Sequence, residues 1–218
     1  MVTIKTKGGM CLGRMCLATT IAAIFTTTML LTASAFADGL SWQYLDVRYQ
    51  QPADDNTQGL AAELSGHIAK NWVLQTRVSY LQLEESALDL EMSQARFDLA
   101  IGRVFTLSDR FAAIVSAGYT RLEYRMDLGT FSDDAGEHAG NVQLGLRTGI
   151  TRKFEAEASV GMLFDDEDTS DLLWNASIRY RAIPALSFLL GVSGVESDVF
   201  DSDDILYEIG FRFDLMED

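Results

Sequence analysis

Apolar and polar residues alternate along nearly all of this 218-residue chain beyond its first 37 residues. This period of two is that of a β-strand with one apolar and one polar face. We count ten such segments, which are roughly residues 40–50, 59–69, 71–83, 93–105, 110–124, 139–150, 153–164, 172–181, 185–195 and 205–215. A helical period does not occur in this part of the sequence, and neither does a linker. The pattern therefore predicts a single all-β domain.

The connections between these segments alternate in length. Tight turns are expected at 69–71, 106–109, 151–152 and 182–184, and longer loops at 51–58, 84–92, 125–138, 165–171 and 196–204. Short turns at one end and long loops at the other are typical of a closed, antiparallel, up-and-down transmembrane β-barrel. We predict about ten strands, with both chain termini at the turn end. Eight strands remain the alternative, because the first and ninth segments are the least regular.

Aromatic residues are placed near both ends of the predicted apolar faces, and aliphatic residues lie mostly between them. The turn-end set is Trp42, Trp72, Phe105, Phe111, Phe154, Tyr180 and Phe213, and the loop-end set is Tyr49, Tyr80, Tyr119, Phe164, Trp174 and Tyr207. Two aromatic girdles are expected where rings lie at the level of lipid headgroups. A soluble β-sandwich, the alternative fold, has no reason to sort aromatics in this way. In the first segment Trp42 and Tyr44 are out of phase with Val47 and Tyr49, so we predict a bulge there.

The first 37 residues have the three parts of a secretory signal peptide. Lys5, Lys7 and Arg14 precede an apolar run, and Ala35-Phe36-Ala37 ends it. We predict cleavage before Asp38, which leaves residues 38–218 as the barrel domain; an uncleaved membrane anchor is the alternative. Both cysteines lie in this leader, so the remaining chain has no thiol chemistry. Without the three leader bases the formal charge falls from −15 to −18, which disfavours nucleic acid as a partner.

The last strand carries the sharpest motif. Glu208, Gly210, Phe213 and Leu215 match the polar, glycine and apolar positions that the assembly machinery of outer-membrane barrels reads, although three residues follow where such chains usually end on an aromatic. With the leader and the opening residues 40–49, this motif makes the chain resemble the small outer-membrane β-barrel proteins of the OmpA/OmpX type, or porin-family β-barrel domain, over about 38–215. The resemblance implies the outer membrane of a Gram-negative bacterium, with lipid, lipopolysaccharide and the barrel-assembly machinery as partners. It implies no single activity.

The face opposite the apolar stripes carries charges of both signs, which a barrel would point into its lumen. The bases are Arg77, Arg96, Arg147, Arg179 and Arg212, and the acids are Glu63, Asp98, Glu155, Glu157 and Glu208. Unpaired charges in a narrow interior are costly, so equal numbers favour a lumen plugged by ion pairs. The alternative is a charged ring that selects ions in a narrow channel.

The predicted loops hold 20 of the chain's 32 acidic residues, which predicts an acidic outer surface. The run Asp165, Asp166, Glu167 and Asp168 offers oxygen ligands for a hard divalent ion. It lacks the glycine-turned spacing of a dedicated calcium loop. A solvated acidic loop that shares divalent ions with lipopolysaccharide phosphates therefore fits better, and we predict neither a dedicated metal site nor a cofactor.

Catalytic residue types are scarce, because the chain has only two histidines. His67 is expected on the lumen face. His138 follows Asp133, Asp134 and Glu137 in the longest predicted loop, where an outer-membrane protease would activate water between Asp and His. No Asp-x-His pair matches that arrangement. We therefore predict a non-enzymatic barrel with a structural or cell-surface interaction role; a narrow passive porin and a rim hydrolase are the alternatives.

Overall fold

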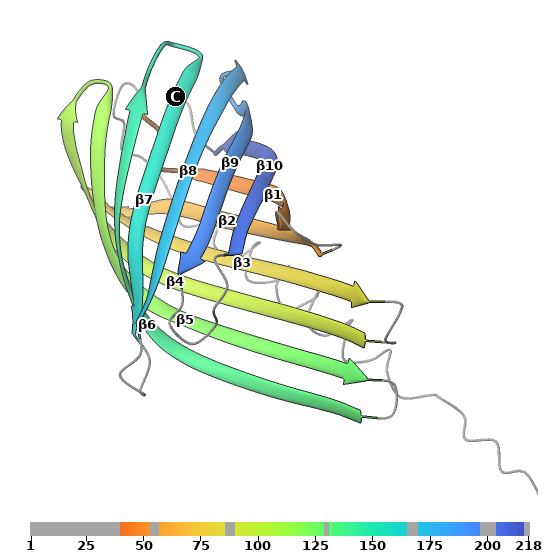
Figure 1. The fold of residues 1–218 in the computed structure, drawn as a ribbon. Coiled ribbons are helices and arrows are strands. Elements are labelled where there is room, and N and C mark those ends of the chain that lie inside the picture. The colour runs from red at the N-terminus through yellow and green to blue at the C-terminus, as the bar shows by residue number, and fades with distance from the viewer. Residues whose placement is uncertain are drawn as a thin grey trace, which may run out of the picture. The chain divides into compact units, whose positions relative to one another are not determined.

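Ten antiparallel strands close into a single up-and-down barrel (Figure 1). The computed structural model of the protein describes residues 40–52, 57–85, 90–128, 131–164, 170–196 and 204–215. The strands are β1 (Tyr44–Pro52), β2 (Gln58–Ala69), β3 (Trp72–Glu85), β4 (Leu90–Ser108), β5 (Phe111–Leu128), β6 (Phe131–Gly149), β7 (Phe154–Phe164), β8 (Ser170–Ile183), β9 (Leu186–Glu196) and β10 (Asp204–Asp214). The prediction of a ten-stranded closed barrel is confirmed, and the eight-stranded and sandwich alternatives are wrong. No helix in the described part of the chain is long and apolar enough to cross a membrane.

The start of the first strand and the end of the last strand lie together at the turn end of the barrel. β1 pairs with β10 from Tyr44 opposite Asp214, and the Leu215 N–H donates a hydrogen bond of 3.0 Å to the Gln43 carbonyl. At the same end, Lys70 and Asn71 form the turn between β2 and β3, and Asn71 has a positive φ of 63°. Asparagine tolerates this left-handed conformation better than most residues, which suits it to a tight hairpin.

The outer surface is apolar, with aromatic rings toward both strand ends. Trp72, Phe154 and Phe213 point outward at the turn end, and Tyr80 and Phe164 do so at the loop end. Aliphatic side chains, including Ile101, Val115, Leu144, Val160 and Ile209, lie exposed between them. This is the sorting that the sequence predicted, with one exception in the first strand.

That exception is Trp42, which we assigned to the turn-end girdle. It is 5% exposed and lies inside the barrel, before β1 begins. β1 pairs with β10 and β2 without a register shift, so the predicted bulge is also wrong. Tyr44 and Asp46 are buried and Val47 is exposed, in simple alternation. Trp42 does share the inward phase of Tyr44; the error was to treat both as outward-facing.

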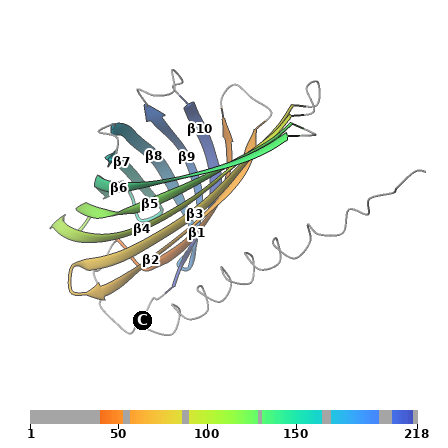
Figure 2. The ribbon, with the colours of Figure 1, turned by 90° about the horizontal axis from the view of Figure 1, so that it is seen from below.

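Three neighbouring strands are much longer than the rest. β4, β5 and β6 have 19, 18 and 19 residues, against 11 in each of β7, β9 and β10. β6 pairs with β7 only from Gly140 onward, while its earlier residues pair with β5 as far as Phe131 opposite Leu128. Figures 1 and 2 show the loop ends of β3–β6 reaching past the rest of the barrel. The predicted loop at 125–138 is therefore mostly a projecting hairpin, and most of the predicted loop at 84–92 is strand.

Candidate functional site

Four charged residues fill the lumen near the turn end; we call them the turn-end quartet. They are Arg147 on β6, Glu155 and Glu157 on β7, and Arg179 on β8. Arg147 lies 2.8 Å from Glu157 and 3.3 Å from Glu155, and Arg179 lies 2.6 Å from Glu155 and also pairs with Glu157. Each carboxylate thus contacts both guanidinium groups. Arg147 and Arg179 are 1% and 2% exposed, so both guanidinium groups are buried, while the side chains of Glu155 and Glu157 remain 15% and 22% exposed.

The residues before β1 pack against the turn-end quartet; we call residues 40–43 the N-terminal segment. Arg147 Nη1 donates a hydrogen bond of 2.6 Å to the Ser41 carbonyl, and its guanidinium lies 4.1 Å from the centre of the Trp42 ring. Leu40 and Trp42 also belong to a buried apolar cluster that includes Val73, Val104, Ala112 and Ile114. The N-terminal segment is therefore held by a hydrogen bond, a cation–π contact and apolar packing at once.

A second group of charges, the mid-lumen cluster, is centred on Arg48 of β1. Arg48 contacts Asp46 at 2.8 Å, Glu208 at 2.9 Å and Glu63 at 3.3 Å. Asp46 also accepts two hydrogen bonds from Arg212, of 2.6 and 2.7 Å, and Glu208 accepts one from Arg77. Most of these groups are almost fully buried, and their charges compensate one another.

Tyr44 connects the mid-lumen cluster to the turn-end quartet. Its hydroxyl donates a hydrogen bond of 2.7 Å to Glu63, and the guanidinium of Arg212 lies 3.3 Å from the centre of its ring. Arg147 lies 5.2 Å from the same ring. The side chain is fully buried, so one tyrosine contacts charged groups of both clusters.

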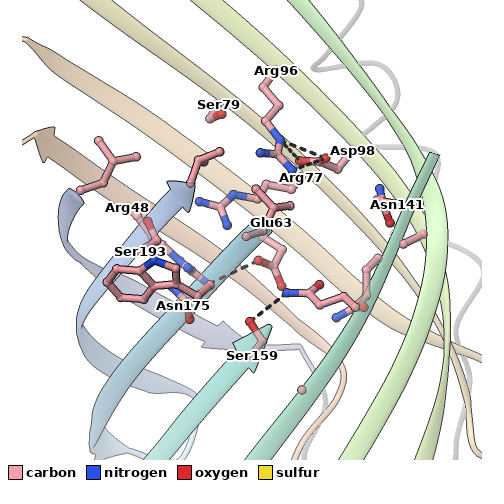
Figure 3. Close-up of a pocket in the computed structure, with 18 of the residues that line it drawn as sticks. Arg48, Glu63, Arg77, Ser79, Arg96, Asp98, Asn141, Ser159, Asn175 and Ser193 are labelled. Atoms are coloured by element: carbon pink, nitrogen blue, oxygen red, sulfur yellow. Dashed lines mark hydrogen bonds and ion pairs between the residues drawn. The ribbon is translucent and has the colours of Figure 1, made fainter. Parts of the chain in front are cut away.

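The third group of lumen charges is a single ion pair between Arg96 and Asp98. It lies farther toward the loop end, and its side chains are more exposed to solvent. Both residues come from β4, their charged atoms are 2.9 Å apart, and Thr120 of β5 donates a hydrogen bond of 2.6 Å to Asp98. The side chains are 23% and 14% exposed. Beside this pair is a cavity of about 210 Å³ whose lining comes from all ten strands (Figure 3).

All ten charged residues that the sequence assigned to the lumen lie there and have an oppositely charged partner. The structure separates them into the turn-end quartet, the mid-lumen cluster and the Arg96–Asp98 pair. The sequence analysis missed Tyr44, Asp46, Arg48 and Gln50, which supply the centre of the mid-lumen cluster. Their alternation was visible in the sequence, but placing Trp42 and Tyr44 on the outer face obscured it.

The C-terminal motif residues have different surroundings. Glu208 is buried in the mid-lumen cluster, Phe213 points outward, and Leu215 follows β10. A Cβ atom on Gly210 would lie 2.3 Å from the Val47 carbonyl oxygen, so a larger residue would displace β1. The residue types at two of the four positions, Glu208 and Gly210, are therefore explained by packing within the barrel, apart from any role in assembly.

Among the described residues, neither the candidate metal ligands nor the candidate catalytic histidine forms a metal or catalytic group. Asp165, Asp166, Glu167 and Asp168 lie outside the described residues, and those described include no group of His, Cys, Asp and Glu side chains arranged to hold a metal. His138 lies on the projecting hairpin, where its Nδ1 forms a hydrogen bond with the Tyr119 hydroxyl and the two rings stack. Tyr119 is one of the outward-facing aromatics, so this contact lies on the outer face and not at the lumen.

A closed antiparallel barrel with an apolar outside, aromatic strand ends and a polar, ion-paired inside is an outer-membrane β-barrel. The sequence matches the family model of the outer membrane protein beta-barrel domain over residues 23–182, and the chain belongs to this family. The matched range begins within the predicted leader and ends at the close of β8.

Several solved barrels are similar in fold but distant in sequence. The NanC porin is 10% identical, with a TM-score of 0.47 over 78% of this chain and 98% of that one. Ail, the attachment invasion locus protein of Yersinia pestis, is 13% identical, with a TM-score of 0.44 over 80% and 100%. The N-terminal β-barrel domain of Pseudomonas aeruginosa OprF is 11% identical, with a TM-score of 0.38 over 80% and 98%. No curated protein matches the sequence.

Proposed function

We propose that this protein is a non-conducting outer-membrane barrel with a structural or cell-surface interaction role. The observation that carries the proposal is the packing of charged and apolar side chains across the turn-end half of the lumen. There the turn-end quartet and the N-terminal segment occupy the path that a solute would take, with Arg147 held against both Glu157 and Ser41. An eight-stranded barrel is just filled by its own side chains, and ten strands add little room.

Opening this path requires breaking buried contacts. Removing one partner of a buried ion pair costs about 3–5 kcal/mol, because the other charge is left uncompensated. Displacing the N-terminal segment would in addition expose Leu40 and Trp42, which are 8% and 5% exposed. Thermal motion therefore opens the lumen only rarely, which supports a plug over a charge-selective channel.

Conductance in a planar bilayer tests the proposal. Purified barrel should give at most small and infrequent currents. A steady conductance comparable with that of a general diffusion porin would refute the plug and favour the alternative, a narrow passive porin. The buried clusters would then be lining a permanent path instead of blocking one.

The proposed orientation places the loop end outside the cell and the turn end in the periplasm. The turns are basic, and Arg110, Arg152, Lys153 and Arg181 line a cavity of about 480 Å³ at that end. The projecting β5–β6 hairpin carries Asp133, Asp134 and Glu137, all exposed, which supports an acidic outer surface among lipopolysaccharide and its divalent ions. This hairpin is the surface that would meet a partner, and the outward-facing His138–Tyr119 contact supports a non-enzymatic role.

Labelling on whole cells tests this orientation. A cysteine at Asp133 or Asp166 should react with an impermeant thiol reagent, and one at Lys70 or Lys153 should not. The reverse pattern would show that the barrel is inverted. The proposed export signal has its own measurement, since the intact mass of the protein from the membrane fraction should begin at Asp38. A mass that still includes Met1 would contradict cleavage.

A further inference from the structure

The lumen contains a cavity on the loop side of the turn-end quartet and the N-terminal segment. It has a volume of about 210 Å³, and Trp42 is among the residues that line it. Six of its lining residues carry side-chain amides: Gln50, Gln75, Gln94, Asn141, Gln143 and Asn175. An amide offers both a donor and an acceptor and carries no charge. Such a wall is suited to a ligand with several groups that donate and accept hydrogen bonds.

The charged residues that line the cavity are already paired with one another or with the clusters below. Arg96 is held by Asp98, Arg77 by Glu208, and Glu157 by the two arginines of the turn-end quartet. A charged ligand would have to break one of these pairs, or bring its own charge into the barrel without compensation. A neutral ligand meets neither cost.

Two buried polar atoms on this wall have no partner among the described residues. They are the Oε1 atom of Gln50 and the Nε atom of Arg48. Gln50 is 1% exposed and Arg48 4%, and both line the cavity. The Gln50 amide nitrogen is used, since it donates a hydrogen bond of 2.7 Å to Glu208. An unpaired acceptor and an unpaired donor therefore remain in residues that line the cavity, and leaving such atoms buried without a partner is costly.

A hydroxyl group donates and accepts at once, so the hydroxyl groups of one ligand match a wall of side-chain amides. We propose that this cavity binds a small, neutral, polyhydroxylated molecule, such as a monosaccharide or the terminal sugar unit of a glycan. The cavity is smaller than the roughly 300–1,000 Å³ of sites for drug-sized ligands, which fits one sugar ring. Trp42 and Ile114 add apolar surface for the C–H groups of such a ring. This inference goes beyond the proposed function, because binding in solution does not depend on conductance or on which end faces outward.

Isothermal titration calorimetry on the folded barrel tests the proposal, in a detergent without a sugar headgroup such as a dimethylamine oxide. The probes are D-glucose, D-galactose and N-acetylglucosamine, with D-glucuronate and D-glucosamine as charged analogues. At least one neutral sugar should bind saturably, and its charged analogues should bind at least tenfold more weakly. Tenfold corresponds to about 1.4 kcal/mol, roughly one hydrogen bond.

Two variants locate the site, and a third is the control. Gln50→Leu and Asn175→Leu each remove an amide from the cavity wall, and each should weaken binding about tenfold. Ser116→Ala changes a buried lumen residue outside the cavity lining and should leave the affinity unchanged. Asn175→Leu guards against misfolding, because its amide makes only one long contact, of 3.5 Å, with the Val192 carbonyl. Absence of saturable binding by all three neutral sugars, tighter binding of a charged analogue, or equal affinity in all three variants would overturn the proposal.

Discussion

The two halves of the lumen are built from the same strands, but their charged residues differ in how they are paired and how deeply they are buried. At the turn end, each carboxylate of the turn-end quartet faces two guanidinium groups, and Arg147 and Arg179 are almost fully buried. At the loop end, Arg96 and Asp98 form a single pair that remains partly exposed beside a cavity. The difference shows that the number of charges facing a lumen does not decide how deeply they are buried. The burial of Arg147 depends also on other groups, here the N-terminal segment, that pack against it.

Burial also sets the energetic weight of each pair. A partly exposed pair contributes about 0–1 kcal/mol, because water and salt screen it. Deleting one member of a buried pair costs about 3–5 kcal/mol, most of it from the charge left behind. The same substitution, arginine to alanine, should therefore have a large effect in one half of the barrel and a small effect in the other.

Removing both arginines of the turn-end quartet should produce the largest effect. Arg147→Ala with Arg179→Ala removes both close partners of Glu157, leaves Glu155 only the longer contact of 3.9 Å with Arg181, and releases the Ser41 carbonyl. We expect the barrel to lose more than about 3 kcal/mol of unfolding free energy, or to open. Urea unfolding in lipid vesicles, followed by the gel mobility of the folded barrel, measures the first outcome, and bilayer conductance measures the second.

A matched variant separates the loss of charge balance from the loss of packing. Adding Glu155→Gln and Glu157→Gln to the double variant removes the negative charges of the quartet as well as the positive ones, and should recover part of the lost stability. If the double arginine variant unfolds at the wild-type urea concentration and passes no current, the turn-end quartet neither stabilises nor blocks the barrel. A selectivity change without any change in stability would instead favour the channel alternative.

The N-terminal segment should come second in size. Trp42→Ala removes a buried ring that packs with Leu40 and Ile114 and carries the Arg147 guanidinium on its face. Truncating a buried tryptophan costs about 3–5 kcal/mol in a well-packed core, and we expect the lower part of that range here because the segment lies before β1, outside the sheet, and can shift. Brief current steps should appear as the segment becomes loose. Both readouts are the same as for the quartet variants.

Trp72→Ala provides the control for this prediction, since Trp72 belongs to the outward-facing set and is 42% exposed. It should reduce stability less than Trp42→Ala does, and it should leave conductance unchanged. Equal effects of the two substitutions on stability and current would mean that Trp42 does not close the lumen.

The sequence predicted the barrel well because its main signal is local. A period of two depends only on which face of a strand is apolar and which is polar. The inward and outward residues of β7 could therefore be predicted directly: Phe154 and Val160 are exposed on the outside, and Glu155 and Glu157 point inward. The projecting hairpin was misjudged because its acidic composition is typical of loops. Its two strands in fact remain paired within the predicted loop, where Arg125 lies opposite Asp134.

The site was only partly predictable, because contacts across the lumen depend on strand tilt and register. The sequence placed Glu208 and Arg212 on the inner face, but nothing in it paired them with Arg48 and Asp46, more than 150 residues away. The cavity could not be predicted either, since its size and position depend on how all the inward-facing side chains pack in three dimensions. The amides that line it, such as Gln75 and Gln143, are ordinary inward-facing residues of a barrel strand.

The smallest expected effect is that of Arg96→Ala, at the loop end. In this variant Asp98 keeps its hydrogen bond from Thr120, and the Asp98 side chain stays partly exposed. The remaining carboxylate is therefore still hydrogen-bonded and solvated. We expect a loss of less than about 1 kcal/mol in urea unfolding. Arg212→Ala is the buried counterpart, because Arg212 is 2% exposed and makes two hydrogen bonds to Asp46. It should cost at least three times as much, since Asp46 would then depend on Arg48 alone for compensation. Equal costs for the two arginines would mean that burial does not distinguish the halves of the lumen, and the contrast that supports a plugged turn end beside an open cavity would fail.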